Sequence, residues 1–197
     1  TMVSQYEFLV CIDGDALLHP HAVFWMMHHL TSFPRAGAVT GNPRIINRSS
    51  ILGKLQVGEF SSIIGLIKRA QRTYGRIFCV SGAIAGFRKT ALDRIGYWRD
   101  DMITEDIDVS WRLQFDHWDL QYVPKALCYI YMPETFKGLW KQRLRWSQGG
   151  VEVLFAHVRN MFKWRLRRMW PIAIEAMISI IWAYVIFGIF LLYLYGL

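Results

Sequence analysis

The chain has 197 residues, 53% of them hydrophobic, and carries a formal net charge of +8. A chain of this length and composition can bury a sizeable core and still has apolar residues left over. The basic excess lies beside an uncharged C-terminal segment, and no base-reading motif accompanies it. This pattern argues against nucleic-acid binding and favours a membrane and an anionic substrate.

The N-terminal residues predict a β-α-β unit. Phe8–Ile12 is continuously apolar, as expected of a strand covered on both faces in a mainly parallel sheet. Pro20 suits the first turn of a helix that continues to about Leu30, and residues 38–40 form the next short strand. The first apolar run is too short for a signal peptide, so we expect the chain to start at an internal point of a longer protein.

The middle of the chain predicts alternating helical and extended segments. Residues 49–67 predict a helix with a serine cap, and residues 78–80 and 83–87 predict strand. After a short helix and a glycine turn, Thr104 is predicted to cap a helix whose apolar residues are four positions apart.

Two segments near the C-terminus predict contact with a membrane. From Thr135 a helical pattern mixes aromatic and basic residues, which fits a helix at a membrane interface. Residues 176–197 contain no charge, and a helix of that length crosses a hydrocarbon core of about 30 Å. A buried core helix is the alternative, although soluble domains of this size rarely enclose so long an uncharged segment. Basic residues before this segment place the upstream chain in the cytoplasm: Lys163, Arg165, Arg167 and Arg168.

The first candidate site is Asp13 and Asp15, separated by one glycine after the first strand. In open α/β folds the carboxyl edge of the sheet binds ligands. Mg²⁺ prefers one or two carboxylates together with phosphate oxygens and water, so this pair predicts a metal and nucleotide anchor. An ordinary Asp-Gly turn is the alternative interpretation of the same residues.

The second candidate site is the acidic group Glu105, Asp106 and Asp108 after Thr104. Acidic residues at a helix start complement the helix dipole. The same position also suits a general base that faces a sugar hydroxyl. The residues alone leave both interpretations open.

The third candidate site is Gln142, Arg145 and Trp146, which a helix places along one face. The amide and guanidinium predict charge-assisted bonds to a diphosphate, and the indole predicts support for a sugar ring. A basic helix facing anionic lipid is the alternative, which explains the charge but not this particular set of residues.

The chain contains four features in a fixed order: Asp-x-Asp, Thr-Glu-Asp, Gln-x-x-Arg-Trp and a predicted membrane helix. The order resembles the processive family-2 glycosyltransferases, such as cellulose, chitin and hyaluronan synthases. Four longer stretches resemble the bacterial poly-β-1,6-N-acetylglucosamine synthases of that family: residues 40–44, 58–69, 101–108 and 132–146.

The resemblance implies an α/β, GT-A-like (Rossmann-like) glycosyltransferase core in residues 1–133. Amphipathic interfacial helices would occupy residues 134–170, and a transmembrane helix residues 171–197. The core would be N-terminally incomplete, because the family has an earlier strand, a helix and a uridine-contacting aspartate. We therefore expect the 197 residues alone to be inactive.

The resemblance also implies a role for each candidate residue. Asp106 would be the catalytic base. The donor UDP-N-acetylglucosamine would be bound with Mg²⁺ or Mn²⁺ at Asp13 and Asp15, and by Gln142, Arg145 and Trp146. The acceptor sugar would contact four residues: Ser81, Gly82, Glu105 and Trp146.

The implied partners are a growing polysaccharide, the lipid bilayer and a small membrane accessory subunit. The implied location is the bacterial inner (cytoplasmic) membrane, with the catalytic domain in the cytoplasm. A synthase of another polymer is the alternative within the family. From a different class, an inactive membrane-anchored binding module would predict damaged carboxylates, yet the motif carboxylates are present.

Overall fold

The computed structural model describes residues 3–73 and 75–196. The chain divides into two units, one that ends at Val153 and one that begins at Leu154. The first contains a mixed sheet with its covering helices, and the second contains the end of one long helix and a C-terminal helix.

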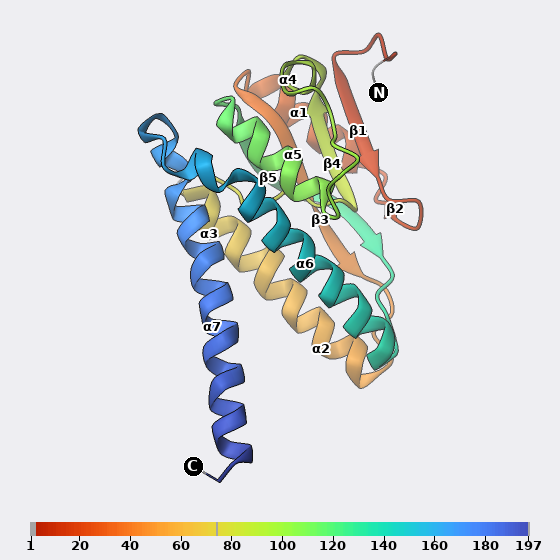
Figure 1. Cartoon of the computed structure of the whole chain (residues 1–197). Helices are drawn as coiled ribbons and strands as arrows, with labels where there is room; N and C mark the ends of the chain where they lie inside the picture. Colours follow the sequence, from red (N-terminus) through yellow and green to blue (C-terminus); the bar gives the residue numbers. More distant parts are fainter. Residues whose placement is uncertain (1–2, 74, 197) are drawn as a thin grey trace. The chain divides into compact units, whose positions relative to one another are not determined.

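The sheet has five strands in the order β1-β4-β3-β5-β2 (Figure 1). The strands are β1 (Phe8–Ile12), β2 (Leu17–Leu18), β3 (Ala36–Ile45), β4 (Ile84–Arg88) and β5 (Asp119–Ile130). Among the described strands only β3 and β5 pair in parallel, and the other three pairs are antiparallel. The expectation of a mainly parallel sheet is therefore wrong.

Strand β1 explains that error. Phe8 and Val10 pack against one hydrophobic cluster, and Leu9 and Cys11 pack against the other. Coverage on both faces was predicted from the apolar run and is confirmed. Burial on both faces does not fix strand direction, however, and β1 pairs antiparallel with β4.

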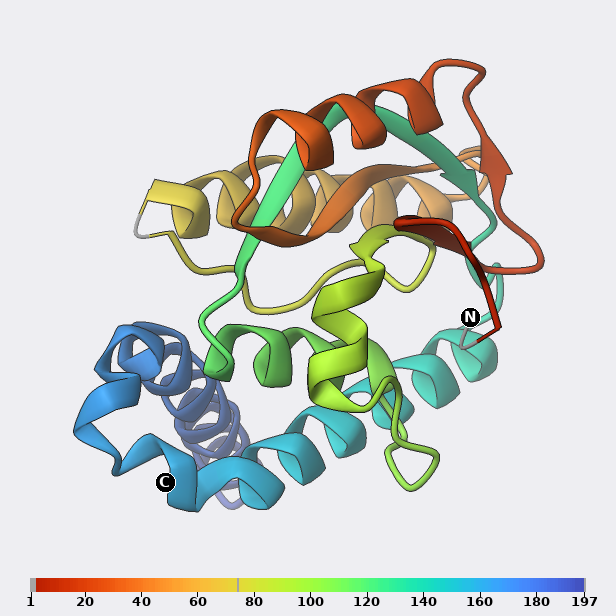
Figure 2. The ribbon, with the colours of Figure 1, turned by 90° about the horizontal axis from the view of Figure 1, so that it is seen from above.

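Helices cover both faces of the sheet. α1 (Ala22–Ser32) lies on one side, and α4 (Lys89–Ile95) and α5 (Glu105–Phe115) lie on the other (Figure 2). Met26 belongs to the cluster on the α1 side, and Leu113 belongs to the cluster on the α5 side. The two hydrophobic clusters thus enclose the sheet from both faces.

A continuous helical stretch follows β3. It consists of α2 (Ile51–Phe60), the π-helix η1 (Ser61–Ile67) and α3 (Lys68–Thr73). The Ser50 side chain accepts a hydrogen bond from the Gly53 N–H at 2.9 Å, which confirms the predicted serine cap. π-Helical segments occur frequently at functional sites.

Helix α6 (Phe136–Met161) begins where the sequence predicts a helix and lies beside α2 (Figure 1). Arg143 of α6 donates to Glu59 of α2 at 2.6 Å. The rings of Trp146 and Phe60 pack with centroids 6.4 Å apart. These contacts hold the Gln-x-x-Arg-Trp segment within the first unit.

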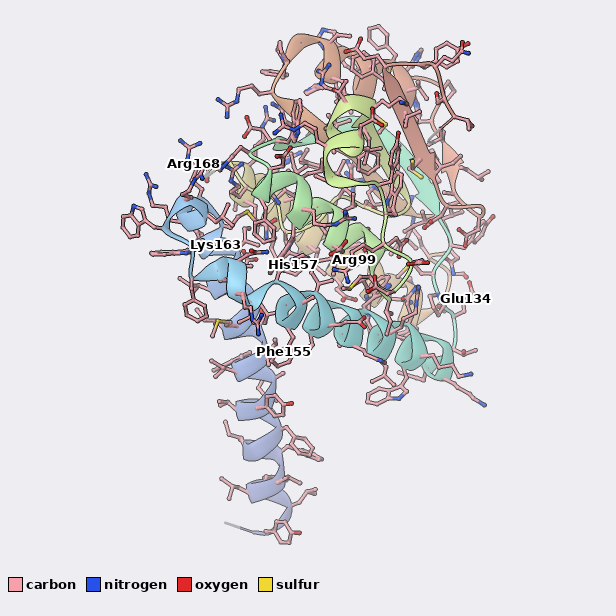
Figure 3. All side chains as sticks on the ribbon, turned by 45° about the horizontal axis from the view of Figure 1, so that its top comes forward. Arg99, Glu134, Phe155, His157, Lys163 and Arg168 are labelled. Atoms are coloured by element: carbon pink, nitrogen blue, oxygen red, sulfur yellow. The ribbon has the colours of Figure 1, made fainter. Side chains whose placement is uncertain are left out.

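In the second unit the 3-10 helix η2 (Trp164–Met169) leads into α7 (Trp170–Leu194). Lys163 and Arg168, two of the basic residues before α7, lie beside and within η2 (Figure 3). The stretch Trp164–Leu194 is long and apolar enough to cross a membrane, judged by length and composition. The prediction of a long uncharged helix is confirmed from residue 176 to Leu194, where α7 ends, and residue 197 of the predicted segment lies outside the described residues.

Candidate active site

Two carboxylates follow β1 in a tight turn. The Ala16 N–H donates to the carbonyl oxygen of Asp13 at 3.1 Å, and the chain then enters β2. Asp13 and Asp15 are both exposed. The turn and ligand interpretations of this motif are compatible, because the turn presents both carboxylates to solvent.

Residues 78–80 do not form the predicted strand, and β4 begins only at Ile84. Side chains of three other elements accept hydrogen bonds from the backbone N–H groups of this segment. Gln71 of α3 accepts from the Phe78 N–H (3.0 Å), Ser110 of α5 from the Val80 N–H (2.8 Å), and Thr40 of β3 from the Ser81 N–H (2.8 Å). These bonds replace a sheet ladder. They fix residues 77–82, which we term the anchored loop, against the start of α5.

Helix α5 begins at Glu105, but Thr104 does not cap it as predicted. The Thr104 Oγ1 is buried and has no hydrogen-bond partner among the described residues. Asp106 satisfies a first-turn amide instead, since the Ile107 N–H donates to its Oδ1 at 2.9 Å. A Cβ on Gly149 of α6 would overlap the Thr104 side chain, so close packing by α6 accounts for the burial of Thr104.

An open cleft of about 340 Å³ lies between the end of β1, the anchored loop and the start of α5. Its lining includes Asp13, Ser81, Gly82, Glu105 and Asp106. A Cβ on Gly82 would lie 3.7 Å from the Asp106 Oδ2 and 4.0 Å from the Asp13 Oδ2. Five residues singled out in the sequence therefore line one cleft, which is large enough for part of a small ligand.

The Asp106 carboxyl holds its proton more tightly than an ordinary aspartate. Burial raises its pKa, and the neighbouring charge of Glu105 raises it further. The Ile107 amide, the Lys68 ammonium and the Gly82 amide act in the opposite direction. A carboxylate with a raised pKa is a stronger base once it is ionised, which suits general-base catalysis.

Asp13 lies where negative charges converge. Partial burial raises its pKa, followed by the charges of Asp15 and Glu105, while Arg145 of α6 lowers it. A cation would relieve this repulsion, so Asp13 and Asp15 fit Mg²⁺ or Mn²⁺ as carboxylate ligands. The described residues contain no group of three or more His, Cys, Asp or Glu that could hold a metal. Phosphate and water oxygens would complete the coordination.

The three motif residues of α6 differ in their surroundings. Arg145 is exposed, and its charge acts on Asp13. Trp146 is half-buried, with the Arg143 guanidinium 4.6 Å from its ring centroid. The Gln142 Oε1 is buried and has no hydrogen-bond partner within the part of the chain that the structure describes. The positive side chain of this motif thus acts on the acidic cleft.

Sequence reasoning missed several residues that build the cleft. Trp98 and Phe87 line it, with ring centroids 5.2 Å apart in an edge-to-face arrangement, and Trp98 was predicted only as part of a turn. Ser110 and Gln114 are four positions apart on the buried face of α5, and both hold the anchored loop. Polar residues at that spacing on an apolar helix face were the available signal.

Comparison with known proteins identifies the family of the chain. A family model described as "Glycosyl transferase family group 2" matches residues 8–197. The chain is 46% identical over 183 residues to a "Poly-beta-1,6-N-acetyl-D-glucosamine synthase" of Staphylococcus epidermidis, covering 93% of this chain and 44% of that protein. It is 44% identical to a protein of the same name from Staphylococcus aureus, with the same coverage. The chain thus spans less than half the length of these relatives.

A solved structure shares the fold. It is a mannosyltransferase of Pyrobaculum calidifontis in complex with GDP-Man and Mn²⁺, with a TM-score of 0.63 and 20% sequence identity. The similarity covers 97% of this chain and 57% of that one. The predicted GT-A-like fold is confirmed. By its family match and its relatives, the chain belongs to glycosyl transferase family group 2.

Proposed function

We propose that this chain forms the transfer site of an inverting, processive glycosyltransferase. It transfers N-acetylglucosamine from UDP-N-acetylglucosamine to a growing β-1,6-linked polysaccharide of the kind found in biofilms. The observation that carries the proposal is the meeting of Asp13, Asp106 and the anchored loop in one cleft on which the Arg145 charge acts. The names of the staphylococcal relatives support the choice of sugar and linkage.

The donor end of the cleft is the turn after β1. Asp13 and Asp15 would hold Mg²⁺ or Mn²⁺, and the bound ion would neutralise charge on the donor diphosphate. Arg145 lies within electrostatic range of Asp13, so it stabilises the same diphosphate as negative charge builds up on the leaving UDP. Gln142 and Trp146 of the same helix complete the donor side, and Trp146 also supports the acceptor sugar ring.

The acceptor end is the anchored loop with Glu105 and Asp106. Ser81, Gly82 and Glu105 contact the terminal sugar and direct its hydroxyl toward Asp106. Asp106 takes the hydroxyl proton as the acceptor oxygen attacks the anomeric carbon. The bond between that carbon and the UDP oxygen breaks on the opposite side, and UDP leaves with the bonding electrons. One displacement therefore inverts the configuration.

The membrane context follows from α7 and the basic residues before it. In our proposal α7 spans the bacterial inner membrane and the cleft faces the cytoplasm, where UDP-sugars are made. The small accessory subunit belongs to the same proposal.

The test supplies membranes containing the intact protein with separately labelled UDP-N-acetylglucosamine, UDP-glucose or UDP-glucuronic acid. We expect polymer only from UDP-N-acetylglucosamine, with β-1,6 linkages by methylation analysis. Membranes carrying Asp106→Asn serve as the matched control and should form polymer at least about a hundredfold more slowly. Polymer from another UDP-sugar would identify a different synthase, and the absence of transfer from every donor would contradict the proposed activity.

A further inference from the structure

Lys68 is a buried cation next to the cleft. It is the first residue of α3, directly after the π-helix η1, and only 5% of it is exposed. Its Nζ lies 3.4 Å from the Thr40 Oγ1 on β3. The same Thr40 oxygen accepts the Ser81 N–H of the anchored loop at 2.8 Å. Lys68 therefore contacts the group that holds the acceptor side of the cleft.

A buried ammonium is costly unless nearby groups compensate its charge. Burial lowers the pKa of Lys68, while Cys79 and Asp106 raise it. Burial also raises the pKa of the Cys79 thiol to about 12, so Cys79 is uncharged at neutral pH. Asp106 then supplies the compensating negative charge. Among the described residues the Lys68 Nζ bonds to the Thr40 Oγ1, and the Lys68 charge acts on Asp106 through space.

The surroundings of Asp106 show why this cation matters. Glu105 on the same helix opposes ionisation of Asp106, and burial opposes it more strongly. Asp13 faces Asp106 across Gly82 from the turn after β1, and it adds a third carboxylate to the cleft. Lys68 is the cation whose charge acts against these effects at Asp106.

We propose that Lys68 is a positioning residue that keeps the Asp106 carboxylate ionised and, through Thr40, fixes the anchored loop beside it. This inference rests on the proposed function, in which Asp106 is the base. Lys68 acts through Asp106 and Thr40 and does not touch the reacting atoms.

The first experiment measures the pH dependence of sugar transfer by the intact protein at saturating donor, comparing the parent with Lys68→Met. Met keeps the length of the side chain and removes the charge. We expect the acidic limb of the profile to move upward by about one pH unit. Turnover should then be about tenfold lower on the acidic side and recover on the alkaline plateau. Lys68→Arg should keep the limb near that of the parent.

Two further variants separate the charge from structural effects. Lys54→Met removes an exposed cation from α2 and should leave the whole profile unchanged. Thr40→Val keeps the Lys68 ammonium but removes the acceptor of the Ser81 N–H. It should raise KM for the acceptor without moving the acidic limb. A shift of the limb in Lys54→Met, or an equal shift in Thr40→Val and Lys68→Met, would refute a specific role for the Lys68 charge.

The second experiment does not depend on turnover. Infrared difference spectra between parent and Asp106→Asn, with isotope-labelled aspartate, titrate the Asp106 carboxyl directly. The same difference spectra, recorded with Lys68→Met present in both proteins, should give a higher titration midpoint for the Asp106 carboxyl. If Lys68→Met does not reach the thermal midpoint of the parent, Lys68→Gln replaces it. If the parent transfers no sugar, the proposed function fails while this titration still decides the role of Lys68. An unchanged midpoint would overturn our inference.

Discussion

The two acidic groups of the cleft differ in their surroundings more than in their chemistry. Asp13 and Asp15 stand exposed in a turn after β1. Asp106 is held at the start of α5 by its own bond to the Ile107 amide, and the charge of Lys68 acts on it from α3. Neighbouring carboxylates in unlike environments can perform unlike tasks.

In the proposed function, this difference explains how one cleft would provide both a metal site and a base. The exposed pair can rearrange around a hard cation and its water ligands. Asp106 is partly removed from water, and burial is the main reason that its pKa is raised. Exchanging the two tasks would require a buried cation site and an exposed base, which the described fold does not provide at these positions. The predictions below test this division.

The largest effect is expected for Asp106→Asn. The amide keeps the size of the side chain and the bond to Ile107 but loses basicity, so turnover should fall by about 10² to 10⁴. Steady-state transfer from UDP-N-acetylglucosamine by the intact protein measures this. Near-normal polymerisation by the variant would remove Asp106 from the role of base.

A smaller loss of turnover is expected for Gly149→Ala, at the point where α6 packs against Thr104 at the start of α5. In Gly149→Ala the new Cβ would lie 2.9 Å from the Thr104 Cβ and closer still to Oγ1 and Cγ2. Such overpacking costs about 1–3 kcal/mol and should displace the start of α5, lowering turnover while Mg²⁺-dependent UDP affinity remains.

Gly58→Ala is the matched control for that variant. Gly58 is also inside a helix, and a Cβ there meets no described atom within 4 Å. The control should gain roughly 0.5–1 kcal/mol of stability and keep full turnover. If both alanine variants melt at the same temperature as the parent, the close contact between α6 and Thr104 is not as described.

The smallest effect is a change in stability with pH. The pKa of Asp106 is raised in the folded state, so burial of its charge destabilises the fold as pH rises from the ordinary aspartate range through the folded pKa. Asn carries no charge at any pH. Without metal or nucleotide, Asp106→Asn should therefore melt a few degrees higher than the parent at pH 8, with a smaller difference in acid. An equal difference at both pH values would contradict the raised pKa.

Much of this molecule could be predicted from its sequence. Short-range sequence patterns are sufficient to predict three of its features: the uncharged run of α7, the strand β1 and the acidic motifs. The conformation of residues 78–80 could not be predicted. The backbone N–H groups of this region donate to the side chains of Gln71, Ser110 and Thr40, which are distant in the sequence, instead of to a neighbouring strand. The burial of Lys68 could not be predicted for the same reason, because the residues that surround it in the fold come from other elements.

The motif at the start of α5 teaches a related lesson. Thr104 has the residue type and position of a helix cap, and local propensity favoured that interpretation. The packing of α6 at Gly149 buries the hydroxyl instead, and no local rule contains that contact. Tertiary packing overrode the local preference at this point of the proposed site.

The division of labour between the two acidic groups is tested most directly by calorimetry of UDP binding in the presence of Mg²⁺. The intact parent protein is compared with Asp106→Asn and Asp15→Ala under identical conditions. We predict that Asp106→Asn binds UDP with nearly the affinity of the parent. Asp15→Ala should lose Mg²⁺-dependent affinity by at least about tenfold. Loss of binding in Asp106→Asn together with unchanged Mg²⁺-dependent binding in Asp15→Ala would contradict the assignment of the exposed pair to the metal and of the half-buried carboxylate to the base.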